Sequence, residues 1–475
     1  MRSFGAFGGA TGLNNNTGGM LGNNNNTGGM LGNNNNGMMG NNNNMMNNNN
    51  GGMLGNNNMM NHNNNGMMNN NNNGMMGNNS GGMLGNNTNM MNNNNNTNGA
   101  NLRATVTAGV VHTLQHPPSD CISRVRFSPP QCPIIVLGVT AWDSTCSIWR
   151  VDYNKGNQAV TSQPLLQWTH TAPLLDLSIS ARGVCYYGGC CHTATAWDLS
   201  SQAKTVVAQH DLPVSCLTEV CIPQSNMEVL VTGSWDGKLR YWDLRQPATT
   251  GGRPNMLKEE ILGEPIFALD GQKTTPMLSV ATARTVHVFN LNSVMRIAEV
   301  KVTDKIKYNV RAVASSPFQD SVAVGSAEGR VAHLPLQGTT PAPLTSRPHM
   351  TAASLDLPGG RLSGMTSDNT ASVMHQCNFI SFHPQAPYII SGGGDGRVQL
   401  LNYHKKNTNI LEGVKFQNTA GVEEVVPVSA GDVHASGELM ATAHSYDVGT
   451  RGRAGAGGDS PSRCRVRPLV SGRGE

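Results

Sequence analysis

A short segment suited to a tight hairpin recurs along most of the chain, at intervals of about 40 residues. Its clearest copy is GSWDGKLRYWDLR at 233–245, which follows the apolar run 229–231. Asp236 and Gly237 suit a two-residue turn between two strands, and apolar residues alternate on either side of the turn. A unit of this size cannot bury its apolar face alone, so neighbouring copies must stack on one another.

Seven copies can be aligned, and the later ones are more degenerate. The segment 102–114 alternates like a strand and precedes the first complete copy. We expect it to form the outer strand of the last copy, because closing a ring of sheets in this way removes exposed edges. The sequence therefore predicts an all-β, seven-bladed WD-repeat β-propeller over 101–448. The copies lie at 121–152, 170–201, 210–247, 264–293, 309–337 and 376–404, with a seventh that begins near 421.

The third copy carries polar residues that can satisfy one another inside a sheet. His210 precedes its first strand, and Thr232 or Ser234, Asp236 and Trp242 follow. We expect these side chains to form a buried hydrogen-bonded network that stiffens the blade. A catalytic triad of His, Asp and Ser is the weaker alternative.

The first hundred residues have a different composition from the rest of the chain. They are almost entirely Asn, Gly and Met, and Arg2 is their only charged side chain. Such a segment cannot bury enough apolar surface to offset chain entropy, so we expect 1–100 to be a disordered tail. Two interpretations of its Met-Leu clusters stay open: they make weak cohesive contacts, or the tract is an inert product of repeat expansion. The pentapeptide GGMLG recurs at 18–22, 28–32, 51–55 and 81–85.

The C-terminal segment 449–475 is dense in Arg, Gly, Pro and Ser, residues that oppose strand formation. We expect it to be disordered and the seventh blade to be incomplete. The segment is interpreted either as a basic extension or as the product of a frame change. A Pro-, Thr- and Ser-rich stretch at 339–375 is expected to be a long loop between blades five and six.

Charge and cysteine content limit the function classes. Of the formal net charge of +4, Arg2 contributes +1 and 449–475 contributes +4, so 101–448 carries −1. A near-neutral propeller is a poor candidate for gripping nucleic acid unaided, because phosphate neutralisation dominates such binding. The ten cysteines include no CxxC pair and no zinc-like spacing, which indicates reduced thiols, no metal and no cofactor.

No catalytic pattern stands out. We find no nucleophile elbow, no phosphate loop and no acidic cluster that recurs from blade to blade, so no catalytic residue is predicted. No apolar run approaches the roughly 18 residues needed to cross a bilayer, and we expect no membrane partner.

Several further segments are distinctive: FSPP at 127–130, QHDLPV at 209–214, GSWDGKLRYWD at 233–243, GSAEGRVA at 325–332, FHP and GDGRV within 382–398, and HSYD at 444–447. Together they resemble one family of propellers, the mRNA export factors of the nuclear pore, which are relatives of the mitotic checkpoint propeller. The resemblance implies a monomeric adaptor at the nuclear pore complex that binds a GLEBS segment of a GLFG nucleoporin. It also implies a role in the export of messenger ribonucleoprotein, by direct or indirect contact with mRNA. A checkpoint propeller and a generic WD-repeat scaffold are the alternatives.

Two positions depart from the family pattern. His192 stands where the turn of the second blade would show Asp, and Leu401 stands where the sixth blade would show Trp. We expect the internal networks of these two blades to be absent or altered.

Turns between second and third strands, and loops between blades, surround one end of a propeller's channel. Lys238, Arg330 and Arg397 follow the turn glycines, and Arg240 is close by. We expect a modest basic rim that suits an acidic peptide, because guanidinium groups pair well with carboxylates. The alternative is that these are solvated turn residues whose stems cover the sheet.

A second basic cluster follows the sixth copy. His404, Lys405 and Lys406 are adjacent there, at a position that corresponds to a basic loop in the family. Contact with the RNA backbone is the hypothesis for these three residues.

Overall fold

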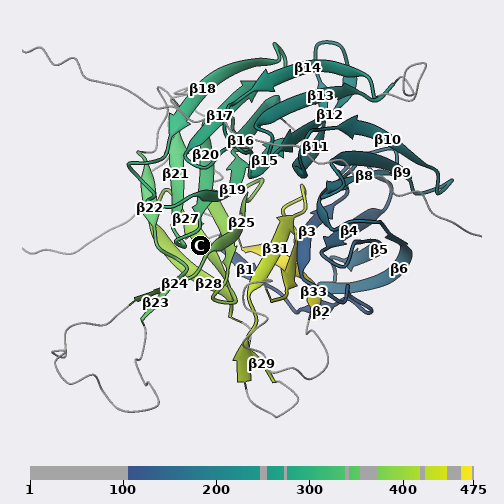
Figure 1. Ribbon diagram of the computed structural model, residues 1–475. Coiled ribbons are helices and arrows are strands. Elements are labelled where there is room, and N and C mark those ends of the chain that lie inside the picture. The colour runs from purple at the N-terminus through teal and green to yellow at the C-terminus, as the bar shows by residue number, and fades with distance from the viewer. Residues whose placement is uncertain are drawn as a thin grey trace, which may run out of the picture. The chain divides into compact units, whose positions relative to one another are not determined.

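The computed structural model shows seven antiparallel sheets arranged as blades around a channel (Figure 1). This confirms the seven-bladed propeller that the repeat spacing predicts, and the residues described include no helix. They belong to one compact unit, 91–475. The predicted disordered tail, 1–100, lies outside the described residues. These are 105–245, 254–271, 275–336, 342–352, 372–413, 415–417, 423–446 and 462–472.

In each blade the first strand lines the channel and the last strand lies at the rim. Blade one contains β3 (Ile122–Phe127), β4 (Ile135–Ala141), β5 (Thr145–Asn154) and β6 (Ala159–Thr169). Blade two contains β7 (Leu174–Ile179), β8 (Val184–Gly189), β9 (Thr193–Asp198) and β10 (Lys204–Gln209). Blade three contains β11 (Val214–Ile222), β12 (Met227–Ser234), β13 (Lys238–Asp243) and β14 (Met256–Ile261). Blade four contains β15 (Ala268–Gly271), β16 (Met277–Ala281), β17 (Thr285–Asn290) and β18 (Met295–Lys301).

The remaining blades follow the same order. Blade five contains β19 (Val310–Ser315), β20 (Ser321–Ser326), β21 (Val331–Pro335) and β22 (Leu344–Ser346). Blade six contains β25 (Cys377–Phe382), β26 (Tyr388–Gly393), β27 (Arg397–Asn402) and β28 (Asn407–Gly413). Small hairpins precede and follow blade six: β23 (Met350–Ala352) with β24 (Ser372–Met374), and β29 (Lys415–Gln417) with β30 (Glu423–Val425). Blade seven contains β31 (Val428–Val433), β32 (Leu439–His444), β33 (Arg463–Gly472) and β1 (Thr105–Ala108), and β2 (His112–Thr113) also pairs with β33.

The last blade is complete, so the expectation that all of 449–475 is disordered is wrong. β33 pairs with β32 on one side and with β1 on the other, and β1 is thus the outer strand of the ring's last blade. The sequence RCRVRPLV alternates arginine with apolar residues, which is a strand period. Cys464 and Val466 therefore reach the core between blades seven and one.

The arginines of β33 lie on its other face, where a buried carboxylate of blade six receives them. Glu412 of β28 pairs with Arg465 Nη1 at 3.0 Å and with Arg467 Nη2 at 2.8 Å. Glu412 and Arg467 are both almost fully buried. The arginines are therefore compatible with a buried strand, because Glu412 of the neighbouring blade neutralises their charge.

The stretch 339–375 is more structured than a long loop. β22 within it is the outer strand of blade five, and His349 is buried beside blade six. The parts at 337–341 and 353–371 lie outside the described residues.

Candidate functional site: the mouth of the channel

One residue from each blade faces the end of the channel where the inner strands begin. Six of these residues lie at β-bulges, where the pairing of the first and second strands of a blade is interrupted. The seventh, Phe267 of blade four, directly precedes β15. A bulge turns one extra side chain out of the ladder. We call these seven residues the mouth ring, and they line a cavity of about 260 Å³. The ring consists of Ser123, Leu175, Ser215, Phe267, Arg311, Asn378 and Ser429.

Several ring residues hold the blades together. Ser123, Ser215 and Asn378 each donate a hydrogen bond to a backbone carbonyl of the following blade, over 2.7, 2.6 and 2.7 Å. Arg311 occupies the equivalent position in blade five, where it is exposed and is the only charged member of the ring. Arg311 is not among the residues predicted from sequence, because the bulge that aims it at the mouth is a property of strand pairing.

An ion pair between half-buried Arg124 and buried Asp176 also lines the cavity. Arg124 Nε lies 2.8 Å from Asp176 Oδ1, and the other carboxylate oxygen accepts the backbone N–H of Leu217 at 3.0 Å. Half-buried Trp142 and Trp235 stand on turns at the same end of the channel. The mouth thus combines aromatic walls with the exposed cation Arg311, a combination that fits an acidic peptide with apolar anchors.

The four predicted rim cations lie at the mouth end, but three of them are already paired. Lys238 Nζ lies 2.6 Å from Asp211 Oδ2, and Arg240 Nε lies 2.7 Å from Glu259 Oε2. Arg330 Nε lies 3.2 Å from the buried carboxylate of Glu328.

Arg397 differs from these three, because no ion pair joins it to a described residue. It is the first residue of β27, and its backbone N–H donates to Asp395 Oδ1 at 3.3 Å. Arg311 and Arg397 are therefore the cations of the mouth end that are best placed to receive an incoming carboxylate.

His404, Lys405 and Lys406 lie at the opposite end of the blades. They form the turn from β27 to β28, whereas the mouth is bordered by the turns between second and third strands. The backbone N–H groups of His404 and Lys405 donate to Asn402 Oδ1, and the His404 ring lies 4.8 Å from that of Tyr403. The two basic sites predicted from sequence are thus separate surfaces.

The polar residues of the third blade form a chain of hydrogen bonds. His210 Nδ1 lies 3.0 Å from Asp236 Oδ2, and His210 Nε2 lies 2.8 Å from Thr232 Oγ1. The indole N–H of Trp242 donates to the same Thr232 oxygen at 2.8 Å. Ser234 lies beside this chain, since its hydroxyl accepts the backbone N–H of Asp236 at 3.1 Å. Burial lowers the pKa of His210, which favours the neutral ring within this network.

Blade six keeps most of this network without its tryptophan. His349 Nδ1 lies 2.8 Å from Asp395 Oδ1 and His349 Nε2 lies 3.0 Å from Ser391 Oγ, while Leu401 is buried in the apolar core. The expectation that His192 stands at the turn-aspartate position of blade two is wrong. The φ of His192 is 63°, close to the 77° of Gly237, so His192 fills the glycine position of the turn.

We expect Asp236→Ala to lower the free energy of unfolding by about 2 kcal/mol, because it leaves a buried imidazole N–H without its charged acceptor. Urea unfolding of the full chain measures this change. Asp211→Ala is the matched control: Asp211 is exposed and we expect a change within about 0.5 kcal/mol. Equal effects of the two substitutions would contradict the role of the buried network.

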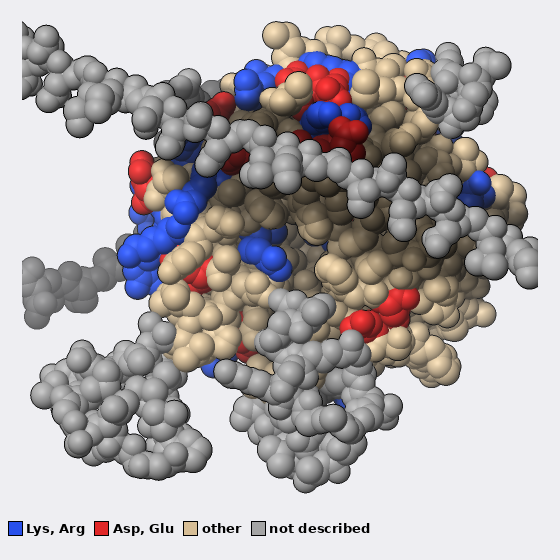
Figure 2. All heavy atoms as spheres, in the orientation of Figure 1, with Lys and Arg blue, Asp and Glu red and all other residues tan. Residues whose placement is uncertain are grey.

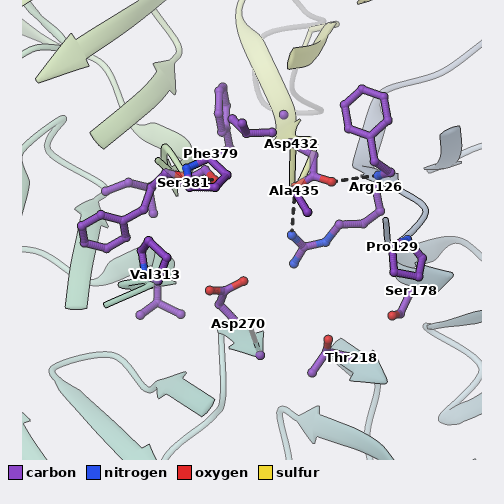
Figure 3. A pocket seen from close by; sticks show the side chains of 18 of the residues that line it. Arg126, Pro129, Ser178, Thr218, Asp270, Val313, Phe379, Ser381, Asp432 and Ala435 are labelled. Atoms are coloured by element: carbon purple, nitrogen blue, oxygen red, sulfur yellow. Dashed lines mark hydrogen bonds and ion pairs between the residues drawn. The ribbon is translucent and has the colours of Figure 1, made fainter. Parts of the chain in front are cut away.

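The other end of the channel holds a wider cavity of about 380 Å³ (Figure 3). The carboxylates that line this cavity, Asp432 and Asp270, accept hydrogen bonds from neighbouring blades. Asp432 accepts the backbone N–H of Phe127 at 2.8 Å and lies 3.4 Å from Arg126 Nη1, and Asp270 accepts the backbone N–H of Ser315 at 2.8 Å. Burial raises the pKa of Asp270. Within the described residues, no group of three or more His, Cys, Asp or Glu side chains is placed to hold a metal ion.

Comparisons with known proteins agree with this architecture. The family model for the WD domain, G-beta repeat, matches 201–243 and 362–402. The WD40 repeat protein poxJ of Penicillium oxalicum is 33% identical over 341 residues, which cover 70% of this chain and 87% of that protein. The mRNA export factor rae-1 of Caenorhabditis elegans is 28% identical over 377 residues, covering 75% of this chain and 90% of the relative.

A checkpoint protein and a solved propeller also match. The mitotic checkpoint protein bub-3 of Caenorhabditis elegans is 25% identical over 334 residues, covering 70% of this chain and 86% of the relative. The solved structure of U3-55K has a TM-score of 0.55 at 14% identity and covers 76% of this chain and 98% of its own. That likeness concerns the fold alone. In the described part of the chain, no helix is long and apolar enough to span a bilayer.

Proposed function

Because the chain belongs to the WD-repeat propeller family that includes the mRNA export factors, we propose that it is a non-enzymatic adaptor in mRNA export. In this role it works in the nucleus at the nuclear pore complex and binds a GLEBS-type segment of a GLFG nucleoporin at the mouth of the channel. Identity is lower to the checkpoint relative than to the export relative, which favours export over a checkpoint role.

The observation that supports peptide binding most is the exposed Arg311 in an otherwise uncharged mouth ring. A carboxylate side chain that enters the mouth can pair with this guanidinium, while apolar side chains of the peptide contact Trp142, Trp235 and Phe267. Arg397 on the neighbouring turn provides a second cation. Lys238, Arg240 and Arg330 support the site from within existing ion pairs.

We expect Arg311→Glu combined with Arg397→Glu to weaken retention of the full chain on a GLEBS peptide by about a hundredfold, because an attractive pair becomes a repulsive one. A pull-down with a titrated peptide measures this. Lys405→Glu with Lys406→Glu, the same charge change at the opposite end, is the control and is expected to bind normally. Arg330→Glu is a poorer probe, because it would place a carboxylate against the buried Glu328. Binding of the mouth variant with unchanged affinity would show that the peptide does not dock there.

Contact of His404, Lys405 and Lys406 with RNA stays a separate proposal. Its support is the adjacency of three basic side chains on one exposed turn. Loss of RNA affinity on Lys405→Ala with Lys406→Ala would support it.

A further inference from the structure

The wide cavity, at the end of the channel opposite the mouth, lies outside the proposed peptide site. Its volume of about 380 Å³ falls within the roughly 300–1,000 Å³ of typical ligand sites. All seven blades contribute residues to its wall (Figure 3). The chemistry of this wall therefore indicates what the cavity can hold.

One side of the wall is polar and the other side is apolar. Blades two, three and four contribute the hydroxyl groups of Ser178 and Thr218 and the carboxylate of Asp270. Blades five and six contribute the aliphatic side chains of Val313 and Ile380. Such a cavity suits a long side chain that has an apolar stem and a polar end.

The charges on the wall favour a cation as the polar end. Arg124 is engaged with Asp176 at 2.8 Å, on the side of the mouth. Arg126 then faces two carboxylates, that of Asp432 at 3.4 Å and that of Asp270, so the wide end carries a net charge of −1. Burial raises the pKa of Asp270 in spite of the nearby Arg126. One further cation would bring the charge of the wide end to zero.

Carboxylates on the surface of blade three are in a different situation. Figure 2 shows Lys and Arg atoms beside Asp and Glu atoms at the top of the view, over β13 and β14. Arg240 pairs there with Glu259 at 2.7 Å, and Lys258 pairs with Glu260 at 2.8 Å. A cation from a partner gains less at this surface, where each carboxylate already has its own cation, than in the wide cavity.

Exposed apolar side chains border the entrance of the wide cavity. Phe318 follows Pro317 of the cavity wall and is 53% exposed, and Ile134 of blade one is 39% exposed. Both lie on turns that join the first strand of a blade to the second, and these turns surround this end of the channel. Residues on either side of an inserted side chain can contact them, which favours a peptide segment over a small free amine.

We propose that the wide cavity binds the side chain of a lysine from a partner protein, within a segment that has apolar residues beside this lysine. The methylene groups lie along Val313 and Ile380, and the ammonium group meets the Asp270 carboxylate and the Thr218 hydroxyl. Lysine fits better than arginine, because an ammonium group is a compact charge with rotatable donors, whereas a planar guanidinium group would have to lie beside that of Arg126. This site is separate from the peptide site proposed at the mouth.

Saturation-transfer NMR of the full chain with the peptide acetyl-Gly-Leu-Lys-Leu-Gly-amide tests the proposal, because it detects weak ligands and identifies the protons in contact. We expect saturation of the lysine methylene protons. The same peptide with norleucine in place of lysine is expected to bind about tenfold more weakly, because it keeps the stem and lacks the charge. Adhesion to apolar surface alone would instead favour the norleucine peptide.

Substitutions in the cavity separate charge from space. Asp270→Asn is expected to weaken binding of the lysine peptide about tenfold, while asparagine keeps an oxygen for the Ser315 N–H that Asp270 accepts at 2.8 Å. Asp211→Asn, the same change at an exposed carboxylate of the mouth end, is the matched control and is expected to bind normally. Ala435→Phe narrows the cavity without a change of charge and is also expected to weaken binding.

The proposal is wrong if the lysine peptide does not bind, if the norleucine peptide binds as tightly, or if Asp270→Asn and Asp211→Asn behave alike. A GLEBS peptide is expected to bind normally to Asp270→Asn and to Ala435→Phe, because both changes lie away from the mouth. Failure of this proposal and failure of the proposed function are therefore distinguishable.

Discussion

Removal of residues 463–475 is expected to unfold the propeller or to leave blade seven unfolded at ambient temperature. The deletion removes β33, which pairs along six residues with β32 and along four with β1. The outer strand β1 then has no sheet to join, and β32 becomes an exposed edge.

The expected cost is comparable with the stability of a whole domain. Burial of Val466, Leu469 and Cys464 contributes about 5 kcal/mol at roughly 2 kcal/mol for each large apolar side chain. Loss of Arg465 and Arg467 leaves Glu412 buried without a cation, which costs about 3–5 kcal/mol more. Native domains are stable by only about 5–15 kcal/mol in total.

Hydrogen exchange and urea unfolding check this expectation. In the shortened chain we expect protection to be lost at 105–108 and at 439–444, the two strands that border β33. A chain that lacks only 473–475 serves as the control and is expected to unfold like the full chain. An unchanged unfolding midpoint without β33 would mean that this segment is not part of the ring.

Acidification from pH 7 to pH 5 is expected to lower the free energy of unfolding, and two buried histidines contribute about 4 kcal/mol of this loss. Burial lowers the pKa of His333 to about 4 and that of His444 to about 3. His333 is stacked on Tyr403 with ring centroids 4.5 Å apart, and His444 lies near Arg465 on β33. Burial opposes the charged form of both rings, and the nearby Arg465 opposes it further at His444, where Nε2 also lies 3.8 Å from Glu412 Oε1.

The sign follows from the proton balance of the two states. An unfolded histidine has a pKa of about 6.5, so below that pH the unfolded chain binds protons that the folded chain excludes. Each of these residues therefore stabilises the fold fully above about pH 6.5 and loses its contribution as the pH falls towards its folded pKa. At pH 5 the loss is about 2 kcal/mol for each residue.

Urea unfolding at the two pH values measures this loss, and His333→Phe isolates one contributor. Phenylalanine retains the stacking on Tyr403 and cannot titrate, so we expect the pH-dependent loss to fall by about 2 kcal/mol. His116→Phe, the same substitution at an exposed histidine, is the control against which the pH dependence of His333→Phe is compared. An identical pH dependence in His333→Phe and the full chain would contradict the assignment.

The sequence by itself determined the number of blades, the hairpin turns and the residues of the third-blade network. These features are local: a turn glycine such as Gly237, a period of two, and a spacing of about 40 residues can all be read along the chain. Lys238, Arg330 and Arg397 were placed at one end of the channel for the same reason, because each follows a turn of known direction.

Only the tertiary structure decided which chain segments complete blade seven and which cation faces the mouth. It also decided that His349 belongs to the hydrogen-bonded network of blade six. β33 is stable as a strand because Glu412, on another blade, neutralises its arginines, and no local pattern reveals that partner. Arg311 reaches the mouth through a bulge, which depends on the register of two strands. Pairing register and burial of charge arise between segments far apart in the chain, so they follow from packing rather than from local composition.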